Sequence, residues 1–275
     1  MKDQKVWYVT GASKGLGLAL VQLLLSNGNK VAATTRNVSA FDELLLAYPN
    51  DLLPLAVDIT SDENVKESIQ QTITHFGQLD VVVNNAGYSL VGSMEELTDL
   101  EFRETIDVNL FGTVNVIRAT MPYFRKQGSG HFINISSNAG YVGFANAASY
   151  NAAKFAVIGI SEALAEETKQ FGIKVTVVAP GQFRTSFMDS LTFAENKIPV
   201  YKLAEAEKMW RGYSGTQIGD PVKLVQIIVD LANLSEPPLH LLLGPDTYKL
   251  VTEHREKEKL EIASWKNITL STNFD

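Results

Sequence analysis

Short runs of apolar, β-branched residues alternate along the chain with longer stretches of mixed polarity. Seven runs have the length and composition of buried strands: Val6–Thr10, Lys30–Thr35, Leu52–Val57, Leu79–Asn84, His131–Ser136, Lys174–Ala179 and Leu239–Leu243. Helical periodicity is readable at Leu16–Ser26, Asp62–Phe76, Asp99–Phe124, Ser149–Gln170 and Pro221–Leu234. Strands that alternate with helices predict parallel pairing through right-handed crossovers. We therefore expect a single α/β domain built on a doubly wound, seven-stranded parallel sheet with helices on both faces.

Two segments depart from this alternation. Residues 185–216 mix aromatic with charged residues and are longer than an ordinary connection between a strand and a helix. We expect them to form an insertion that acts as a lid over a substrate. Residues 246–275 include a charged stretch and Trp265. They are expected to form a solvated helix and a frayed tail, or else to take part in assembly.

Composition narrows the function classes. The chain has 275 residues, 45% of them hydrophobic, which is enough for a sizeable core in one domain. A formal charge of -7 argues against a nucleic-acid or anionic-membrane surface. The sequence has no cysteine, and its histidines show no metal-binding spacing: His75, His131, His240 and His254. With no signal-peptide pattern and no membrane-length apolar stretch, we expect a cytoplasmic protein without a metal.

The turn after the first predicted strand is rich in glycine and opens the first helix. It reads Thr10-Gly11-Ala12-Ser13-Lys14-Gly15-Leu16-Gly17. Glycines at such a turn let the backbone approach a pyrophosphate, toward which helix N–H groups point. The spacing Gly-x-x-x-Gly-x-Gly resembles the loop of short-chain dehydrogenase/reductases, a family with a Rossmann fold. It predicts cofactor contacts from Gly11, Ser13, Lys14, Gly15, Leu16 and Gly17.

The end of the second strand indicates which dinucleotide binds. An acidic residue there would bind the ribose 2′-hydroxyl of NAD and repel a 2′-phosphate. This chain carries Thr34-Thr35-Arg36 instead. Because Arg36 and Lys14 can approach the same phosphate, NADP(H) is favoured, although Arg36 could also be a solvated loop charge. By resemblance to the family, Asp58 and Ile59 contact the adenine; Asp58 as a helix cap is the alternative.

Two further segments lie at the carboxyl ends of strands, the edge where open α/β sheets bind ligands. Asn84-Asn85-Ala86-Gly87 ends the fourth strand; Asn85, Ala86 and Gly87 leave room for a cofactor, and the asparagines can tie strands together. Pro180-Gly181-Gln182-Phe183-Arg184-Thr185 resembles the family segment that covers the nicotinamide, with contacts from Pro180, Gly181, Phe183 and Thr185. Thr185 is placed to bind the carboxamide, whereas Arg184 is as readily structural.

A tyrosine and a lysine stand one helical turn apart. Tyr150 and Lys154 share one face of the helix predicted at Ser149–Gln170, thirteen residues after Ser137. The pair alone is a pattern that chance could supply, so the prediction of a catalytic pair depends on its position in the chain. Asn109 adds a polar group inside an otherwise apolar helix, where its amide needs a partner.

Together with the glycine loop, these residues resemble the Asn-Ser-Tyr-Lys tetrad of short-chain dehydrogenase/reductases over nearly the whole chain. The resemblance implies hydride transfer between NADP(H) and a carbonyl or alcohol. Lys154 would lower the pKa of Tyr150, the proton donor, and both would contact the cofactor. Ser137 would donate to the carbonyl oxygen. Asn109 would hold a water leading from Lys154, or be purely structural.

The substrate is less determined than the chemistry. An apolar substrate wall is predicted, with ordinary packing as the alternative for each residue, at Phe144, Phe187, Leu191, Phe193, Met209 and Trp210. We expect a small hydrophobic ketone, aldehyde or secondary alcohol. The Phe183-Arg184-Thr185 pattern and the tail around Trp265 resemble the branch grouped with 17β-hydroxysteroid dehydrogenases, which does not identify a substrate.

Two other functions remain open at this point, namely an NAD-dependent alcohol dehydrogenase and a non-catalytic, dinucleotide-bound sensor or scaffold. The helices predicted at 99–124 and 149–170 are long and partly apolar beyond what one sheet face needs. Their equivalents in the family form subunit interfaces. We therefore expect a homodimer or homotetramer.

Overall fold

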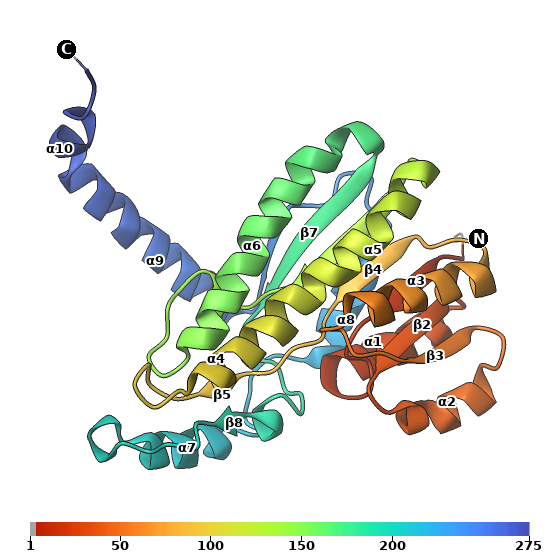
Figure 1. Cartoon of the computed structure of the whole chain (residues 1–275), viewed down its shortest axis with the longest axis horizontal. Coiled ribbons are helices and arrows are strands. Elements are labelled where there is room, and N and C mark those ends of the chain that lie inside the picture. Colours follow the sequence, from red (N-terminus) through yellow and green to blue (C-terminus); the bar gives the residue numbers. More distant parts are fainter. Residues whose placement is uncertain (1–3, 275) are drawn as a thin grey trace.

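A seven-stranded sheet forms the centre of the computed structural model, which describes residues 4–274 (Figure 1). The strands lie in the order β3-β2-β1-β4-β6-β7-β9, and every neighbouring pair is parallel. Their bounds are β1 Val6–Val9, β2 Lys30–Thr35, β3 Leu52–Ala56, β4 Val81–Asn84, β6 Gly130–Ile135, β7 Ile173–Pro180 and β9 His240–Leu243. The predicted α/β Rossmann architecture is confirmed, with every strand end within two residues of its expected place.

Helices cover both faces of this sheet. One face carries α1 (Gly15–Ser26) and α8 (Pro221–Leu231); the other carries α3 (Asp62–Phe76), α5 (Gly112–Gln127) and α6 (Ala148–Thr168). Successive residues of β1 divide between them: Trp7 and Val9 pack in the core under α1 and α8, and Val6 and Tyr8 in the core under α3 and α5. Because both faces are buried, the strands are continuous apolar runs, which made them legible in the sequence.

The helix predicted at Asp99–Phe124 is present and runs on to Gln127, but the structure has a π-helical turn inside it. Helix α4 spans Asp99–Ile106, a π-helical turn spans Asp107–Phe111, and α5 follows. The backbone N–H of Gly112 bonds to the carbonyl of Asp107, one residue further back than in an α-helix. A π turn contains no helix-breaking residue, so the apolar periodicity continues through it. Asn109 lies in the middle of this interruption.

The insertion at residues 185–216 has a small core of its own. It contains β8 (Thr192–Phe193) and α7 (Leu203–Gly212), and β8 pairs in parallel with β5 (Leu90–Val91). Leu191, Ala194 and Leu203 are buried there against Val91. Strands of two residues have no periodicity to read, so the sequence did not predict this second sheet. The short exposed helix α2 (Asp42–Ala47) was missed for a similar reason.

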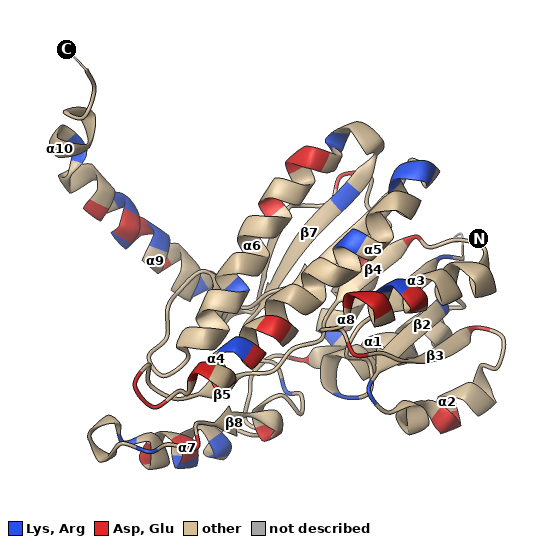
Figure 2. Ribbon diagram, viewed as in Figure 1, with Lys and Arg blue, Asp and Glu red and all other residues tan. Residues whose placement is uncertain are grey.

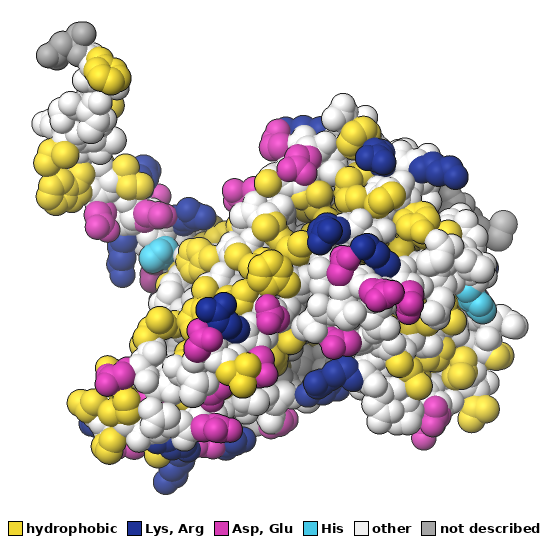
Figure 3. Space-filling model, viewed as in Figure 1, with side chains coloured by type: hydrophobic (Ala, Val, Ile, Leu, Met, Phe, Trp, Pro, Cys, Tyr) yellow, Lys and Arg dark blue, Asp and Glu magenta, His cyan; other side chains and the backbone are white. Residues whose placement is uncertain are grey.

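The C-terminal segment leaves the body of the molecule (Figure 1). Helix α9 spans Pro245–Ser264 and α10 spans Lys266–Leu270. Val251 is the last buried residue of the described chain, and charges of both signs alternate along α9 beyond it (Figure 2). Apolar side chains are also exposed on this arm (Figure 3), namely Leu260, Ile262, Trp265, Ile268 and Leu270. Among residues 4–274 no helix is both long enough and apolar enough to span a bilayer.

Candidate active site

A cavity of about 1030 Å³ opens at the carboxyl edge of the sheet. It lies across the boundary between β1 and β4, where the strand order reverses and open α/β sheets bind ligands. The structure brings most of the predicted site residues into its wall: Gly11, Ser13, Lys14, Gly15, Leu16, Arg36, Asp58, Ile59, Asn85, Ala86, Gly87, Asn109, Ser137, Tyr150, Lys154, Pro180, Gly181, Phe183 and Thr185. Among the predicted catalytic and cofactor-binding residues, Gly17 alone lies outside that wall.

Close approach of backbones fixes the glycine loop against the end of β4. Gly11 has a φ of +62°, and a Cβ at this position would lie 2.7 Å from the Cα of Ala86. A Cβ on Gly17 would lie 2.5 Å from the carbonyl oxygen of Gly11 and 2.7 Å from Nδ2 of Asn85. Gly17 therefore packs beneath the loop, and its lack of a side chain is needed for that packing rather than for a direct contact in the cavity.

Hydrogen bonds reinforce the same junction. The hydroxyl oxygen of Thr10 accepts the backbone N–H of Asn85 at 2.9 Å and that of Ala86 at 3.0 Å. In return, the Asn85 amide donates to the carbonyl oxygens of Thr10 at 2.9 Å and Gly11 at 3.1 Å. Lys14, the N-cap of α1, supplies no side-chain cap within the described chain. The first N–H groups of α1 therefore depend on another acceptor, as at an anion site.

A second set of buried amides joins the strands behind the loop. Asn84 donates to the amide oxygen of Asn134 at 2.8 Å, and Asn134 donates to the hydroxyl of Ser161 on α6 at 2.8 Å. The predicted tie between strands through an asparagine is thus present in the structure. It links β4, which ends beside the glycine loop, through β6 to α6, which carries Tyr150.

Two cationic side chains border the cavity near the ends of β1 and β2. Arg36 follows β2, and the Lys14 ammonium donates to the hydroxyl of Ser190 in the insertion at 2.8 Å. Asp58 does not cap α3, as one alternative had it. Its Oδ1 accepts the N–H of Thr60 at 2.9 Å, and Ser61 is the residue that caps the helix. Asp58 is thus a turn residue at the cavity wall.

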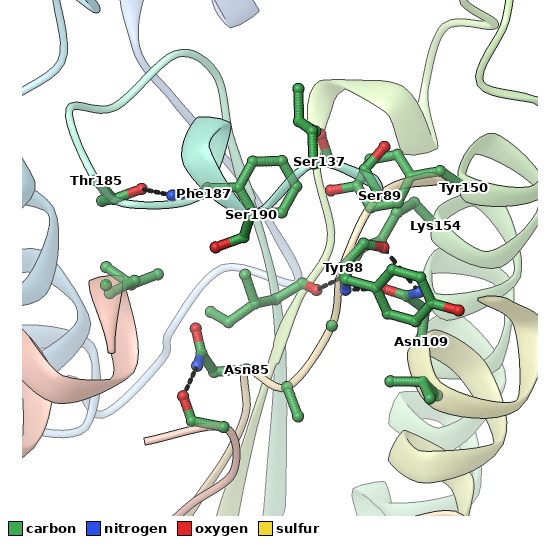
Figure 4. A pocket seen from close by; sticks show the side chains of 18 of the residues that line it. Asn85, Tyr88, Ser89, Asn109, Ser137, Tyr150, Lys154, Thr185, Phe187 and Ser190 are labelled. Atoms are coloured by element: carbon green, nitrogen blue, oxygen red, sulfur yellow. Dashed lines mark hydrogen bonds between the residues drawn. The ribbon is translucent and has the colours of Figure 1, made fainter. Parts of the chain in front are cut away.

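Ser137, Tyr150 and Lys154 converge on the opposite wall (Figure 4). Ser137 follows β6, while Tyr150 and Lys154 stand one turn apart at the start of α6. The Lys154 ammonium donates to the carbonyl of Ile135 at 2.9 Å and lies 5.6 Å from the centroid of the Tyr150 ring. The neighbouring Ser136 also borders the cavity, but its hydroxyl is engaged in a structural bond that it donates to the carbonyl of Lys154 at 3.0 Å.

Burial dominates the protonation equilibria of this group. Burial raises the pKa of Tyr150 to about 12, and interaction with the Ser137 hydroxyl offsets only part of that rise. Burial also lowers the pKa of Lys154 to about 8. The pKa of Tyr150 therefore lies above the ordinary value of 10, and a lowering contribution from Lys154 stays a prediction. Removing the phenol from water disfavours the phenolate more than its neighbours favour it.

Asn109 uses its side chain to hold the backbone beside it. The amide donates to the carbonyls of Tyr88 at 3.0 Å and Thr105 at 2.9 Å, and its oxygen accepts the N–H of Tyr88 at 3.2 Å. Asn109 is 1% exposed. Both amide hydrogens are thus engaged, so the geometry favours the structural alternative for this side chain. It fixes Gly87 and Tyr88 at the cavity.

The segment after β7 is held by the stretch that precedes α8. Both Nε and Nη2 of Arg184 donate to the carbonyl of Gln217, at 3.3 and 3.1 Å, which gives Arg184 a structural role. Phe183 pairs with Gly219, and the hydroxyl of Thr185 accepts the N–H of Phe187 at 3.3 Å. These bonds place Pro180–Thr185 across the mouth of the cavity, although Arg184 itself does not line it.

The predicted apolar wall is present in part. Phe144, Phe187, Leu191 and Trp210 line the cavity, and the Phe187 ring centroid lies 6.1 Å from that of Tyr150. Two predicted members do not line it. Phe193 lies under the guanidinium of Arg211, and Met209 is 51% exposed. The sequence missed Tyr88, Val91 and Met188, which also line the cavity. Val91 belongs to the β5–β8 pair, which no local sequence pattern predicts.

Two histidines have structural partners. His131 is buried with Nε2 at 3.0 Å from the Thr176 hydroxyl, and Nδ1 of His240 lies 2.8 Å from the hydroxyl of Tyr141. Among residues 4–274, no group of three or more candidate side chains could hold a metal ion.

Comparison with known proteins identifies the family. The family model described as short chain dehydrogenase matches residues 5–196. The chain belongs to the short-chain dehydrogenase family. An oxidoreductase of Botryotinia fuckeliana, named BOA17, is 35% identical over 98% of this chain and 99% of its own. A 3-ketodihydrosphingosine reductase of Bacteroides thetaiotaomicron is 36% identical over 86% of this chain and 87% of its own.

Solved structures of short-chain dehydrogenases share the fold. One from Streptomyces avermitilis superposes with a TM-score of 0.92 at 34% identity, over 99% of this chain and all of the other. ElxO with NADP bound has a TM-score of 0.72 at 28% identity, over 87% and 96% of the two chains. A protein of Burkholderia phymatum in complex with NAD has a TM-score of 0.83 at 19% identity, over 94% and 95%. Both dinucleotides thus occur among the neighbours, and the 17β-hydroxysteroid branch stays a prediction.

Proposed function

We propose that this short-chain oxidoreductase transfers hydride between NADP(H) and the carbonyl–alcohol pair of a hydrophobic substrate, with Tyr150 as general acid and base. One observation carries the proposal. Ser137, Tyr150 and Lys154 reach the same cavity whose other wall is the glycine-rich loop. A proton donor and a dinucleotide site within one cavity is the arrangement that reversible carbonyl reduction requires.

The cofactor, when bound, supplies or accepts the hydride. The phenol of Tyr150 stays protonated at neutral pH because burial raises its pKa to about 12, so it can donate to a carbonyl oxygen as negative charge develops there. The hydroxyl of Ser137 donates a second hydrogen bond to that oxygen. Lys154, with a pKa lowered to about 8, is mostly an ammonium at neutral pH and favours the phenolate left behind. These protonation states favour reduction of the carbonyl.

The residues around the expected dinucleotide fit such a group. The absence of side chains at Gly11 and Gly15 leaves backbone at the wall, and the cavity of about 1030 Å³ has the size of a ligand pocket. Arg36 and Lys14 border the same end, where a 2′-phosphate would add two negative charges. No acidic residue ends β2, and NADP bound to ElxO is a precedent within the family. We therefore favour NADP(H) over NAD(H).

Aromatic and aliphatic side chains support an apolar substrate. Phe144, Phe187, Leu191 and Trp210 line the cavity, three of them from the insertion 185–216, for which we propose the role of a lid. The relative from Bacteroides thetaiotaomicron is named for the reduction of 3-ketodihydrosphingosine. A hydrophobic ketone or aldehyde is the substrate class that this wall favours.

The face formed by α4, α5 and α6 supports a homodimer or homotetramer. Leu100, Phe111 and Phe155 are exposed there at 65%, 50% and 45%, and hydrophobic side chains gather over these helices (Figure 3). A second copy of the chain would cover this face. Sedimentation equilibrium that shows only a monomer at working concentration would remove this part of the proposal.

The proposal is tested with NADPH oxidation over a panel of carbonyl compounds graded by size and polarity. Tyr150→Phe should keep NADPH affinity and lose turnover by about 10²–10⁴-fold, because only the proton donor is removed. Tyr123→Phe is the matched control, since the Tyr123 hydroxyl binds Gln70 far from the cavity and should be dispensable. Equal turnover in the wild type and Tyr150→Phe would reject Tyr150 as the acid.

The same measurements separate the alternatives. Tight NADPH binding without turnover on any carbonyl would favour a dinucleotide-bound sensor or scaffold. Tighter binding of NADH than of NADPH, with alcohol oxidation as the faster direction, would favour an NAD-dependent alcohol dehydrogenase.

A further inference from the structure

Gln217 lies in the stretch that joins the insertion to α8, and its backbone is clamped. Its carbonyl accepts both bonds from the Arg184 guanidinium. Two residues further on, the N–H of Gly219 donates to the carbonyl of Gln182 at 2.9 Å, and the Gly219 carbonyl accepts the N–H of Arg184 at 2.9 Å. A Cβ on Gly219 would lie 2.6 Å from the Phe183 ring. Gln217 therefore has little freedom relative to the segment that follows β7.

The side chain of Gln217 is buried without using its hydrogen-bonding groups. It is 3% exposed, and neither Nε2 nor Oε1 has a partner among residues 4–274. Buried amides are nearly always paired, because an unpaired one loses its bonds to water without replacement. A leucine would occupy similar space without that loss. The amide is thus poor as a packing residue and suited to a polar ligand.

The position of Gln217 indicates which ligand. It lines the cavity together with Leu16, at the start of α1, and with Phe183. Leu16 belongs to the segment proposed to hold the pyrophosphate, and Phe183 to the segment proposed to cover the nicotinamide. A dinucleotide between them presents phosphate oxygens, a ribose and a carboxamide. A glutamine amide can donate to or accept from each of these.

We infer that the Gln217 carboxamide hydrogen-bonds the nicotinamide-mononucleotide half of the bound dinucleotide. It would be a cofactor-binding residue outside both the glycine loop and the Ser-Tyr-Lys group. The inference rests on the proposed function, since it requires that the cavity bind a dinucleotide. Its clamped backbone would hold the amide in place before the cofactor arrives, so that little ordering opposes binding.

The test uses Gln217→Leu and Gln217→Glu in the full chain, with Gln226→Leu as a matched control. Gln226 is exposed on α8, and its side chain donates to Asp230 as its one hydrogen bond within residues 4–274. Affinity is measured by fluorescence titration with NADPH and with adenosine 2′,5′-bisphosphate, which lacks the nicotinamide half. Gln217→Leu should bind NADPH about tenfold more weakly, by loss of one hydrogen bond, and bind the bisphosphate like the wild type. Without ligand it should melt at the same or a higher temperature.

A merely structural glutamine would give a different result. Weaker binding of both ligands to Gln217→Leu, or unchanged binding of NADPH, would overturn the inference. Gln217→Glu keeps the size of the side chain and should fold. It should weaken NADPH binding, because a carboxylate cannot donate a hydrogen bond and repels phosphate. Wild-type affinity for NADPH in this variant would equally overturn the inference. Failure of the wild type to bind either NADPH or NADH would instead reject the proposed function.

Discussion

The two walls of the cavity are held in place by different means. On the side of the glycine loop, Gly11 lies so close to Ala86 that no side chain fits, and the half-buried Asn85 amide completes the junction. On the insertion side, two carboxylates accept backbone N–H groups: Glu96 from Ile198 at 2.9 Å and Glu101 from Glu195 at 3.1 Å. A wall fixed by backbone contact cannot shift without disturbing the sheet. The insertion is joined to the rest of the molecule by these charged hydrogen bonds, by the two-residue β5–β8 pairing and by packing against Val91, so we expect it to open at a lower free energy than the sheet.

The largest effect is expected from a substitution in the glycine loop. Gly11→Ala adds a Cβ 2.7 Å from the Ala86 Cα at a φ of +62°, so the glycine loop must move away from β4. We expect NADPH affinity to fall by about 100-fold or more, which corresponds to roughly 3 kcal/mol. The measurement is a binding titration alongside chemical denaturation.

Gly28→Ala is the control for this change. Gly28 has a φ of +77°, yet a Cβ there would meet nothing within 4 Å. It should cost about 1 kcal/mol of unfolding free energy through backbone conformation alone and leave NADPH affinity unchanged. If both variants bound NADPH alike, the close approach to Ala86 would not be what holds the loop.

The same contrast explains which parts of the structure could be predicted from the sequence. The glycine loop, the Asn84–Gly87 segment and the Tyr150–Lys154 pair are local patterns on continuous apolar elements, so the strands and nearly the whole cofactor wall were predictable. The insertion depends on contacts across more than a hundred residues, such as Thr192 with Ser89 at 3.1 Å. Local periodicity does not indicate such long-range pairs, which is why the sequence wrongly placed Phe193 and Met209 at the cavity.

The part of the cavity formed by Ser137, Tyr150 and Lys154 could be predicted only in part. Residue types and spacing located Ser137, Tyr150 and Lys154, but not the balance of forces on their protons. Burial outweighs the hydrogen bond with Ser137 in the pKa of Tyr150, and burial is a property of the folded chain. The π turn around Asn109 was likewise hidden, since its register differs by one hydrogen bond from that of an uninterrupted helix.

A smaller effect is expected when the second wall is loosened. Glu96 is 1% exposed, and its two oxygens accept the N–H groups of Ile198 and Ser93, so it ties the insertion to the chain before α4. Glu96→Ala removes both charged bonds, each worth about 1.5–3 kcal/mol. Hydrogen exchange at the Ile198 and Ala194 amides should accelerate by about tenfold or more. Exchange at the Ala12 amide, which bonds to Thr34 on the other wall, should not change.

Glu95→Ala serves as the neighbouring comparison. Glu95 is exposed and contacts the insertion only through the Tyr201 hydroxyl, so its loss should alter exchange far less. Apolar substrates should show a raised KM in Glu96→Ala, while NADPH affinity stays that of the wild type. Equal acceleration of exchange on both walls would mean that they do not move independently.

The smallest expected effect is a change in hydrogen exchange at low pH, which should differ between the two walls of the wild-type protein. Burial raises the pKa of Glu96, but bonds from the Ser93 and Ile198 N–H groups and the Ser93 hydroxyl outweigh it, so the pKa lies below the ordinary 4.5 of glutamate. For Glu101, burial is likewise outweighed by bonds from Thr98 and the Glu195 N–H. A carboxyl with a lowered folded pKa stabilises fully above its unfolded pKa, and that contribution is lost as the pH falls through the folded value.

The attachment of the insertion should therefore be constant from neutral pH down to about 5 and weaken below 4.5. After correction for intrinsic rates, exchange at Ile198 should rise a few-fold relative to Ala12 in this window, and Glu96→Gln should abolish most of that pH dependence. If Ala12 and Ile198 lost protection together, acid would be unfolding the whole domain. The carboxylates would then not account for a difference in local stability between the two walls.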